Sequence, residues 1–210
     1  MGRGHTAAEL NFLKLKFASG LAVGLAHVHG VDDRPSMVHY DLHLDNIAVV
    51  AGGTPKLNDF NVAEFLRYNP KTNQTCGFRS RLHDPWWRAP EDVTIGNDNM
   101  LDEKVDIYAL GNLIFHLLTK RWPRGAETLS RMDEERKAVA QGIRPQLDDD
   151  VAESTDPALV VLKEVMDMCY EPDPTRRPSS RHVASLLMRS VAALQKNYSN
   201  VTLERLEISL

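Results

Sequence analysis

The sequence predicts a mainly α-helical domain with a small β ribbon. Four segments carry apolar residues at helical spacing, the strand-like pieces are all short, and no linker or repeat divides the chain. The 210 residues are 42% hydrophobic and 26% charged, as in ordinary soluble domains. We therefore expect one compact domain over residues 1–210.

The first apolar stripe predicts a helix from about Ala7 to His29. Leucine, phenylalanine and valine residues recur there at steps of three and four, which places them on one face. Short β-branched pieces follow at Met37 to His39, Ile47 to Val50 and Pro55 to Leu57. Two glycines separate the last two pieces, as expected for a tight turn in a small ribbon.

A polar, irregular segment runs from Phe60 to Asp92 and contains several turn-forming residues. Loops of this length inside compact domains are often functional, and we interpret this one so. The densest helical pattern follows, from about Asp102 to Thr119, and predicts the core helix. Two later helices are expected, one starting at Pro157 and one preceded by Ser179 or Ser180 as its cap.

Charge and cysteine content exclude some classes of function. The formal net charge of -4 gives no basic field, so nucleic acid is not expected as a partner. Cys76 and Cys169 lie far apart, which argues against a disulfide framework or a thiolate metal site. A reducing, cytoplasmic location is the resulting expectation.

The N-terminus shows no signal-peptide core, and no apolar run approaches the roughly 20 residues of a membrane span. No transmembrane segment is therefore expected. Gly2 and Thr6 fit the M-G-x-x-x-[ST] pattern of N-myristoylation. A pattern this short also occurs by chance, and one acyl chain anchors weakly, so modification at Gly2 stays a minor alternative.

The chemistry of the chain is concentrated in residues 39–46 and 58–61. Phosphoryl transfer needs an oriented hydroxyl group and magnesium to neutralise charge on the phosphates. Asp41 is suited to the first task, while Asn46 and Asp59 offer the hard oxygen ligands that magnesium prefers. The alternative interpretation, isolated aspartates capping turns, does not explain why the three residues occur together at this spacing.

These segments resemble the H-R-D-L-x-x-x-N catalytic loop and the D-F-G motif of eukaryotic protein kinases. The resemblance extends to an A-P-E motif, to the kinase core helix and to a late arginine motif, over about residues 7–195. It implies ATP and Mg²⁺ as cofactors and a protein as substrate. It also implies structural roles for four residues, with a buried ion pair between two of them, Glu91 and Arg177; the others are His39 and Asp106.

The sequence departs from the family pattern at three positions. Tyr40 replaces the arginine that in many kinases binds a phosphorylated activation loop. A phenol lacks the charge and the paired N–H donors of a guanidinium group. Asn61 replaces the glycine of D-F-G, and we expect it to keep that turn because asparagine tolerates positive φ. His43 stands where serine/threonine kinases have lysine, and this D-L-H form resembles the loop of aminoglycoside and choline phosphotransferases.

A hypothesis follows for His43. In serine/threonine kinases a threonine contacts this lysine, and its position aligns with Asp84. Histidine therefore replaces the lysine and aspartate replaces the threonine in this chain. A neighbouring carboxylate favours the protonated imidazole, so we expect His43 to lie between Asp41 and Asp84 as a substitute cation. In the alternative interpretation His43 caps a turn and Asp84 merely precedes Pro85 in a solvated loop.

The resemblance covers only the C-terminal lobe of the kinase fold. The 210 residues contain no G-x-G-x-x-G loop, V-A-I-K lysine or adenine-binding hinge of the N-terminal, ATP-binding lobe. The sequence therefore predicts a serine/threonine protein kinase that needs this lobe for activity. Two alternatives stay open: a pseudokinase lobe that acts as a binding module, and a small-molecule phosphotransferase.

Overall fold

The computed structural model describes residues 5–30, 34–81, 83–94, 100–198 and 201. Helices dominate this part of the chain, which confirms the mainly α prediction. The α-helices are α1 (Ala7–His29), α2 (Pro90–Val93), α3 (Lys104–Thr119), α4 (Met132–Ala140), α5 (Asp149–Ala152), α6 (Pro157–Cys169) and α7 (Ser180–Leu194). Short 3₁₀ turns occur at Leu44–Asn46, Leu129–Arg131, Pro174–Arg176 and Gln195–Tyr198. Gly2, the candidate myristoylation site, lies outside the described residues.

The described strands form antiparallel pairs of two. The predicted ribbon consists of β2 (Ile47–Val50) and β3 (Thr54–Leu57), with Ile47 opposite Leu57 and Val50 opposite Thr54. The two glycines of its turn, Gly52 and Gly53, have φ values of 87° and 72°, a region that favours glycine. The other pairs are β1 (Met37–Val38) with β4 (Glu64–Phe65), and β5 (Phe78–Arg79) with β6 (Met100–Leu101).

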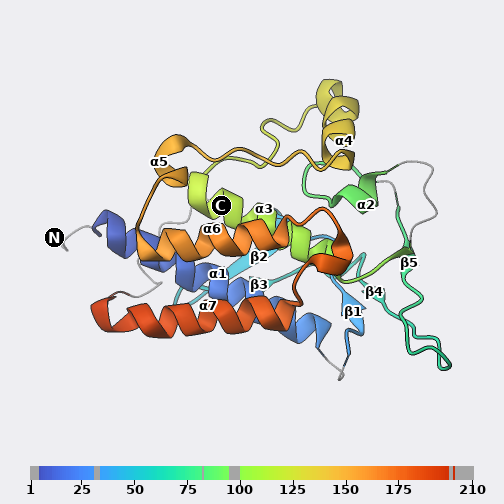
Figure 1. Ribbon diagram of the computed structural model, residues 1–210, viewed down its shortest axis with the longest axis horizontal. Helices are drawn as coiled ribbons and strands as arrows, with labels where there is room; N and C mark the ends of the chain where they lie inside the picture. The colour runs from blue at the N-terminus through green and yellow to red at the C-terminus, as the bar shows by residue number, and fades with distance from the viewer. Residues whose placement is uncertain (1–4, 31–33, 82, 95–99, 199–200, 202–210) are drawn as a thin grey trace.

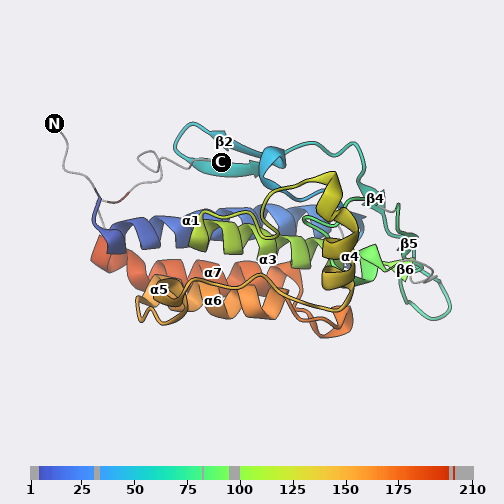
Figure 2. The ribbon, with the colours of Figure 1, turned by 90° about the horizontal axis from the view of Figure 1, so that it is seen from above.

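The long helices α1, α3, α6 and α7 run side by side and enclose the core (Figure 1). The β2–β3 ribbon lies on one side of α1 and α3, whereas α6 and α7 lie on the other (Figure 2). The shorter elements α2, β4, β5 and β6 gather at one end of this stack. No described helix combines the length and apolar character that crossing a membrane would require.

Helix α1 begins and ends where the apolar pattern predicts. Thr6 and Glu9 form a capping box, in which each side chain accepts a hydrogen bond from the other residue's backbone N–H group. Most of the apolar face is buried, with many contacts to α6 and α7, whereas Leu10 near the N-terminus of the helix is exposed. Phe12, on this face, stacks on Tyr198 with ring centroids 4.7 Å apart. This burial makes α1 a fixed platform for the ribbon.

Gly20 of α1 lies directly beneath the ribbon. A Cβ atom at this position would come within 2.8 Å of the Pro55 ring in β3, closer than such atoms normally approach. The absence of a side chain therefore lets the ribbon rest on the helix.

Helix α3 forms the centre of the core, as its dense apolar pattern indicates. Every residue from Val105 to Leu118 is buried. The helix starts at Lys104, two residues later than predicted, because the Asp102 side chain accepts the Lys104 N–H at 3.0 Å and caps the turn.

The two predicted late helices are also confirmed. Asp156 caps α6 by accepting the N–H groups of Ala158 and Leu159, and Ser179 caps α7 by accepting that of His182. The charged helix α4 and the single turn α5 were not predicted. Cys76 and Cys169 are both free thiols, Cys76 exposed and Cys169 buried.

Candidate active site

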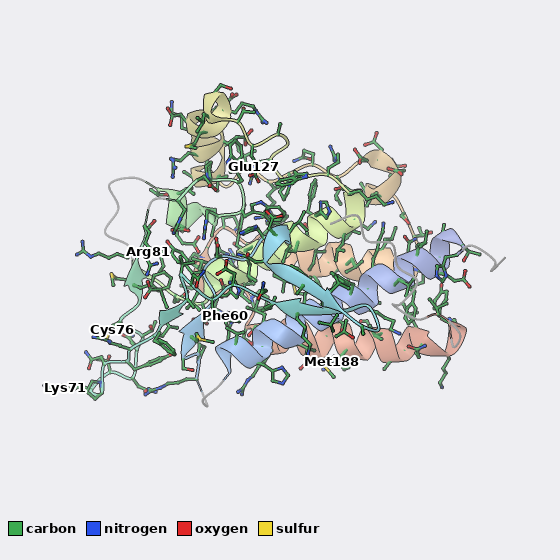
Figure 3. All side chains as sticks on the ribbon, turned by 180° about the vertical axis from the view of Figure 1, so that it is seen from behind. Phe60, Lys71, Cys76, Arg81, Glu127 and Met188 are labelled. Carbon is green, nitrogen blue, oxygen red and sulfur yellow. The ribbon has the colours of Figure 1, made fainter. Side chains whose placement is uncertain are left out.

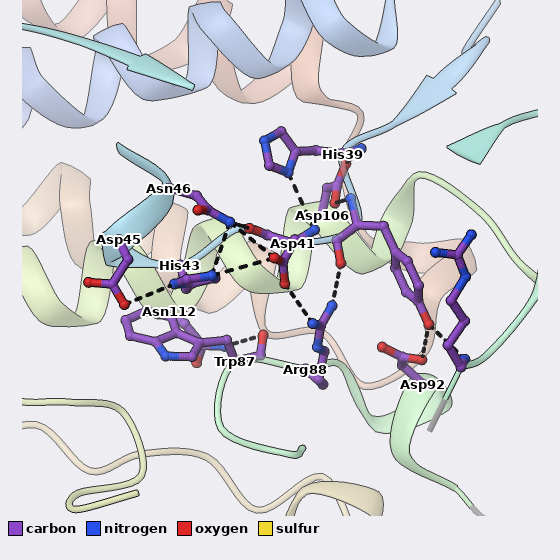
Figure 4. A network of polar contacts seen from close by, with 12 residues as sticks. His39, Asp41, His43, Asp45, Asn46, Trp87, Arg88, Asp92, Asp106 and Asn112 are labelled. Carbon is purple, nitrogen blue, oxygen red and sulfur yellow. Dashed lines mark hydrogen bonds and ion pairs between the residues drawn. The ribbon is translucent and has the colours of Figure 1, made fainter. Parts of the chain in front are cut away.

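The predicted catalytic loop is anchored to the core by one buried carboxylate. Asp106 of α3 accepts the backbone N–H of His39 at 2.7 Å and that of Tyr40 at 2.8 Å (Figure 4). His29 Nε2 lies 2.9 Å from the Asp106 carboxylate, and both side chains are almost completely buried. Tyr40 has a φ of 65°, a left-handed conformation that turns the chain sharply toward Asp41.

Asp41 follows this turn and lies at the centre of a second network. The Arg88 guanidinium contacts its Oδ1 atom at 2.7 Å, and the Asn46 amide donates to its Oδ2 atom at 3.1 Å. His43 Nε2 lies 3.6 Å from the same Oδ2 atom. Figure 4 shows the three partners around one carboxylate, whose side chain is 27% exposed. The structure thus brings the predicted Asp41, His43 and Asn46 together.

The network shifts the protonation equilibria of its members in opposite directions. The contact with His43 and the charge of Arg88 outweigh burial and hold the pKa of Asp41 well below its usual range. In turn, the Asp41 carboxylate raises the pKa of His43 above the ordinary histidine value. Asp41 is therefore ionised at neutral pH, and His43 is more often cationic than a free histidine would be.

Arg88 is a site residue that the sequence analysis missed. Its second guanidinium nitrogen donates to the carbonyl oxygen of Tyr40, so the side chain holds both the backbone and the carboxylate of the loop. Its place directly before Ala89-Pro90-Glu91 was the available signal. Sequence alone does not show which carboxylate that arginine reaches, because Asp41 lies 47 positions away.

Tyr40 connects the loop to the polar segment at residues 60–92. Its hydroxyl donates to the Asp92 carboxylate at 2.9 Å and accepts the backbone N–H of Arg81 at 3.1 Å. Its ring packs edge-on against Phe78 and His83. Burial raises the pKa of Tyr40 to about 12, so the phenol remains a neutral hydrogen-bond donor. This tyrosine holds the segment through the hydrogen bonds of an uncharged phenol and through ring contacts.

Asn46 and Asp59 are the predicted magnesium ligands. Asn46 directly precedes β2 and Asp59 follows β3, so both lie at the same end of the ribbon. The Asn46 carbonyl accepts the Asn58 N–H at 2.9 Å, one residue before Asp59. The Asn58 backbone carbonyl accepts a hydrogen bond from Nε2 of the His39 ring at 2.9 Å, and the His39 ring contacts that of Phe60. The imidazole must be the donor, because a carbonyl oxygen only accepts.

The turn at Asp59 corrects one expectation. Positive φ was predicted for Asn61, but the structure has it at Asp59, with a φ of 58°. The Asn61 N–H instead donates to the Asp59 carboxylate at 3.2 Å, an Asx-type turn. An aspartate carries the left-handed conformation here because its short side chain bonds locally to the backbone.

The chemistry of Asn46 and Asp59 fits magnesium. One amide oxygen and one carboxylate are hard ligands, and a site with so few protein ligands leaves positions for phosphate and water. The Asn46 amide nitrogen is directed to Asp41, which leaves its oxygen for another partner. Among the described residues no cluster of three or more His, Cys, Asp or Glu side chains forms an alternative metal site.

The structure shows no ion pair between the described residues His43 and Asp84, so the hypothesis that links them stays a prediction. Both residues line one hollow of about 110 Å³ beside Asp41, but the second carboxylate in contact with His43 is Asp45, at 3.6 Å from Nδ1. Asp45 was not considered in the sequence analysis. The basic side chains in contact with Asp41 are therefore His43 and the unforeseen Arg88.

Glu91 and Arg177 form the ion pair that the resemblance implied. The guanidinium binds both carboxylate oxygens, at 2.5 and 2.8 Å, and the arginine side chain is completely buried. Arg177 also donates to the carbonyl oxygens of Glu171, Pro172 and Lys104. The pair ties the start of α2 to the turn before α7 and so fixes the far end of the polar segment.

The comparisons with known proteins identify the family of the chain. A family model for the protein kinase domain matches residues 8–188, which is most of the chain. The chain belongs to the protein kinase family. Its catalytic loop, polar segment and core helix all lie inside the matched region.

Relatives of this kinase chain come from several branches of life. It is 30% identical over 80% of its length to "Probable serine/threonine-protein kinase roco9" of Dictyostelium discoideum, and 28% identical over 83% to dual specificity protein kinase shkA of the same organism. It is 27% identical over 83% to MDIS1-interacting receptor like kinase 1 of Arabidopsis thaliana. The matches span only 4%, 30% and 17% of those three proteins.

Proposed function

We propose that this chain carries the phosphoryl-transfer half of a protein kinase site, which moves the terminal phosphoryl group of ATP to a serine or threonine of a protein. The observation that carries the proposal is the Asp41 carboxylate. It is ionised, held from both sides by Arg88 and Asn46, and partly exposed at a hollow beside the catalytic loop. A protein that only bound partners would not need a carboxylate prepared in this way.

Asp41 would act by orienting the acceptor hydroxyl. A carboxylate has about four acceptor positions, so it can accept a hydrogen bond from a hydroxyl while Arg88 and Asn46 stay bound. Its lowered pKa makes it a weak base, which suits a reaction in which the proton leaves the hydroxyl late. Positioning and charge stabilisation, rather than early proton removal, are thus its contribution.

Arg88 and His43 would place positive charge beside the reacting groups. Arg88 is fixed by two contacts to the loop, whereas His43 gains its charge from proximity to Asp41. Asn46 and Asp59 would hold Mg²⁺, which supplies charge neutralisation on the phosphates.

The groups that cover ATP in the family have no counterpart among the motifs of these 210 residues. We therefore expect the 210-residue chain to bind Mg-ATP no more tightly than about 10 μM. Calorimetric titration measures this directly. Tighter binding would mean that another surface of the chain holds the nucleotide.

The decisive experiment measures transfer of labelled phosphate from ATP to serine- and threonine-containing peptides. It compares the 210-residue chain with the full-length product of its gene, each as wild type and as Asp41→Asn. We expect the substitution to reduce kcat at least about 100-fold, because asparagine lacks the negative charge that orients the hydroxyl and receives its proton late in the reaction. Asp133→Asn, on the exposed face of α4, is the matched control and should leave kcat unchanged.

Other outcomes would select the alternatives. Folded protein without any transfer would favour the pseudokinase interpretation, in which the loop is a remnant in a binding module. Labelled choline or aminoglycoside in place of labelled peptide would favour the small-molecule phosphotransferase that His43 suggests. Transfer to peptides that survives Asp41→Asn would contradict the role of Asp41.

A further inference from the structure

Two hollows meet beside the catalytic loop. The smaller, of about 110 Å³, is lined by Asp41 and reaches outward to Trp122 and Glu127. The larger, of about 680 Å³, begins at the same Trp122 and Glu127 and continues between the end of α3 and Pro145. These two side chains therefore border both the place where an acceptor hydroxyl would bind and a larger space next to it.

The wall between the hollows is aromatic and firmly held. Trp87 packs edge-on against Trp122, with ring centroids 6.0 Å apart. The Trp87 carbonyl accepts the side-chain amide of Asn112 at 3.0 Å, and Asn112 accepts the Tyr170 hydroxyl in the core. Trp87 is nearly buried, whereas Trp122 is 43% exposed, unusually high for so large a side chain. An exposed ring on a rigid base is suited to contact with a ligand.

Glu127 is fixed in orientation by the same wall. Its carboxylate accepts the indole N–H of Trp87 at 3.0 Å, from the loop that leads into α4 (Figure 3). That bond uses one of its acceptor positions and leaves the others open. No described lysine or arginine forms an ion pair with Glu127. An oriented carboxylate without a cation therefore lies beside an exposed indole.

The cationic groups nearby are already occupied. Arg88 is bound to Asp41, and His43 lies between Asp41 and Asp45. Arg121, which lines the larger hollow, pairs with Asp148 at 3.1 Å and donates to the Gln146 carbonyl. The free charge that faces the junction of the hollows is thus negative.

We propose that Trp122 and Glu127 form a subsite for an arginine side chain of the acceptor protein, close in sequence to the phosphorylated residue. The inference rests on the proposed function and adds a substrate class to it. A guanidinium is planar, so it can stack on the Trp122 indole and donate two hydrogen bonds to the Glu127 carboxylate. The aliphatic stem of the arginine would lie against the apolar residues at the mouth of the larger hollow.

Other side chains fit this place less well. An acidic residue would meet Glu127 and Asp84 at close range, and like charges repel. An apolar residue would fill the hollow but leave the Glu127 oxygens without a partner in the contact. Arginine also has a precedent in the same hollow, where the Arg121 guanidinium lies over the Phe115 ring at 5.5 Å.

The test measures peptide binding without ATP. A set of fluorescent serine peptides carries a single arginine at each position around the acceptor, and a matched set carries citrulline, which keeps the stem and the planar head but lacks the charge. Fluorescence anisotropy with the 210-residue chain gives each Kd. We expect one arginine position to bind about tenfold more tightly than its citrulline counterpart.

Variants assign that preference to the subsite. Glu127→Gln should remove the difference between arginine and citrulline, and Trp122→Ala should weaken the arginine peptide. Glu127→Lys should instead prefer a peptide with glutamate at the same position. Glu134→Gln, an exposed glutamate of α4, is the matched control and should bind like the wild type. Circular dichroism checks that each variant is folded.

Three results would overturn the inference: equal binding of arginine and citrulline peptides, no binding of either, or an arginine preference that Glu127→Gln leaves intact. Phosphate transfer to the same peptides by the full-length gene product tests the proposed function separately. An arginine preference without phosphate transfer would support the subsite and contradict the proposed kinase activity. Phosphate transfer at equal rates to arginine and citrulline peptides would support the kinase activity and contradict the subsite.

Discussion

Asp106 of α3 and Asp41 of the loop flank the short turn at His39 and Tyr40, yet their surroundings differ. Asp106 is buried and accepts backbone N–H groups, so its hydrogen bonds fix the path of the chain. Asp41 is partly exposed and is bound by side chains that come from other segments. Tyr40, between them, donates its N–H to Asp106 and accepts Arg88 at its carbonyl.

The difference shows how one residue type serves two purposes. The Asp106 network is closed, because its partners are buried and have no room for a further ligand. The Asp41 network is open on the side of the hollow, where an acceptor group can enter. We therefore expect substitutions at the first network to affect stability, and substitutions at the second to affect chemistry.

The largest effect is expected at Asp106. Asp106→Ala would leave the N–H groups of His39 and Tyr40 and the ring of His29 without their acceptor in the core. Stranding buried polar groups in this way typically lowers the free energy of unfolding by on the order of 3 kcal/mol. Urea unfolding measures the change, and Asp133→Ala on exposed α4 should cost less than about 1 kcal/mol. Equal losses for the two variants would remove the distinction between the networks.

A smaller effect is expected for the hydroxyl of Tyr40. Tyr40→Phe keeps the ring contacts but leaves the Asp92 carboxylate and the Arg81 N–H without a partner. We expect a loss of about 1 to 2 kcal/mol in the free energy of unfolding. A double-mutant cycle with Asp92→Asn separates the pair from its neighbours, and a coupling energy near zero would show that the hydroxyl does not hold the segment.

The smallest effect concerns the charge of His43 and should leave stability almost unchanged. Asp41 raises the pKa of His43, so the imidazole keeps its proton to higher pH than a free histidine. The stabilisation from this contact is present below the unfolded-state pKa and is lost as pH rises through the raised value. NMR titration of the ring should give a lower pKa in Asp41→Asn than in the wild type. An unchanged midpoint would mean that Asp45 or burial sets the charge.

The sequence was most informative where local chemistry decides the structure. Helices α1, α6 and α7 were predicted closely because apolar spacing and capping residues such as Asp156 and Ser179 act within a few positions. Helix α4 was missed because it is charged on most sides, and only Val139 is buried. Its position depends on contacts with α2 that no local pattern encodes.

The residues of the candidate site also fall into those that the sequence predicts and those that only the folded structure reveals. The motif residues Asp41, Asn46 and Asp59 could be named because their spacing resembles that of a known family. Arg88 and Asp45 could not, because their role follows from which side chains the folded chain brings to Asp41 and His43. The left-handed turn at Asp59 was misplaced for a related reason, since several nearby residues tolerate positive φ.

The long sequence separation of the hydrogen bonds of Asp106 leads us to expect that they form late when the chain folds. They join His39 to a helix 67 positions later, and His29 to the same residue across 77 positions. Closing loops of that length costs entropy before any contact forms, so these bonds appear only when α1 and α3 have already docked. On this expectation, a partly folded chain would not yet hold Asp41 in place, and the arrangement around its carboxylate would form together with the core.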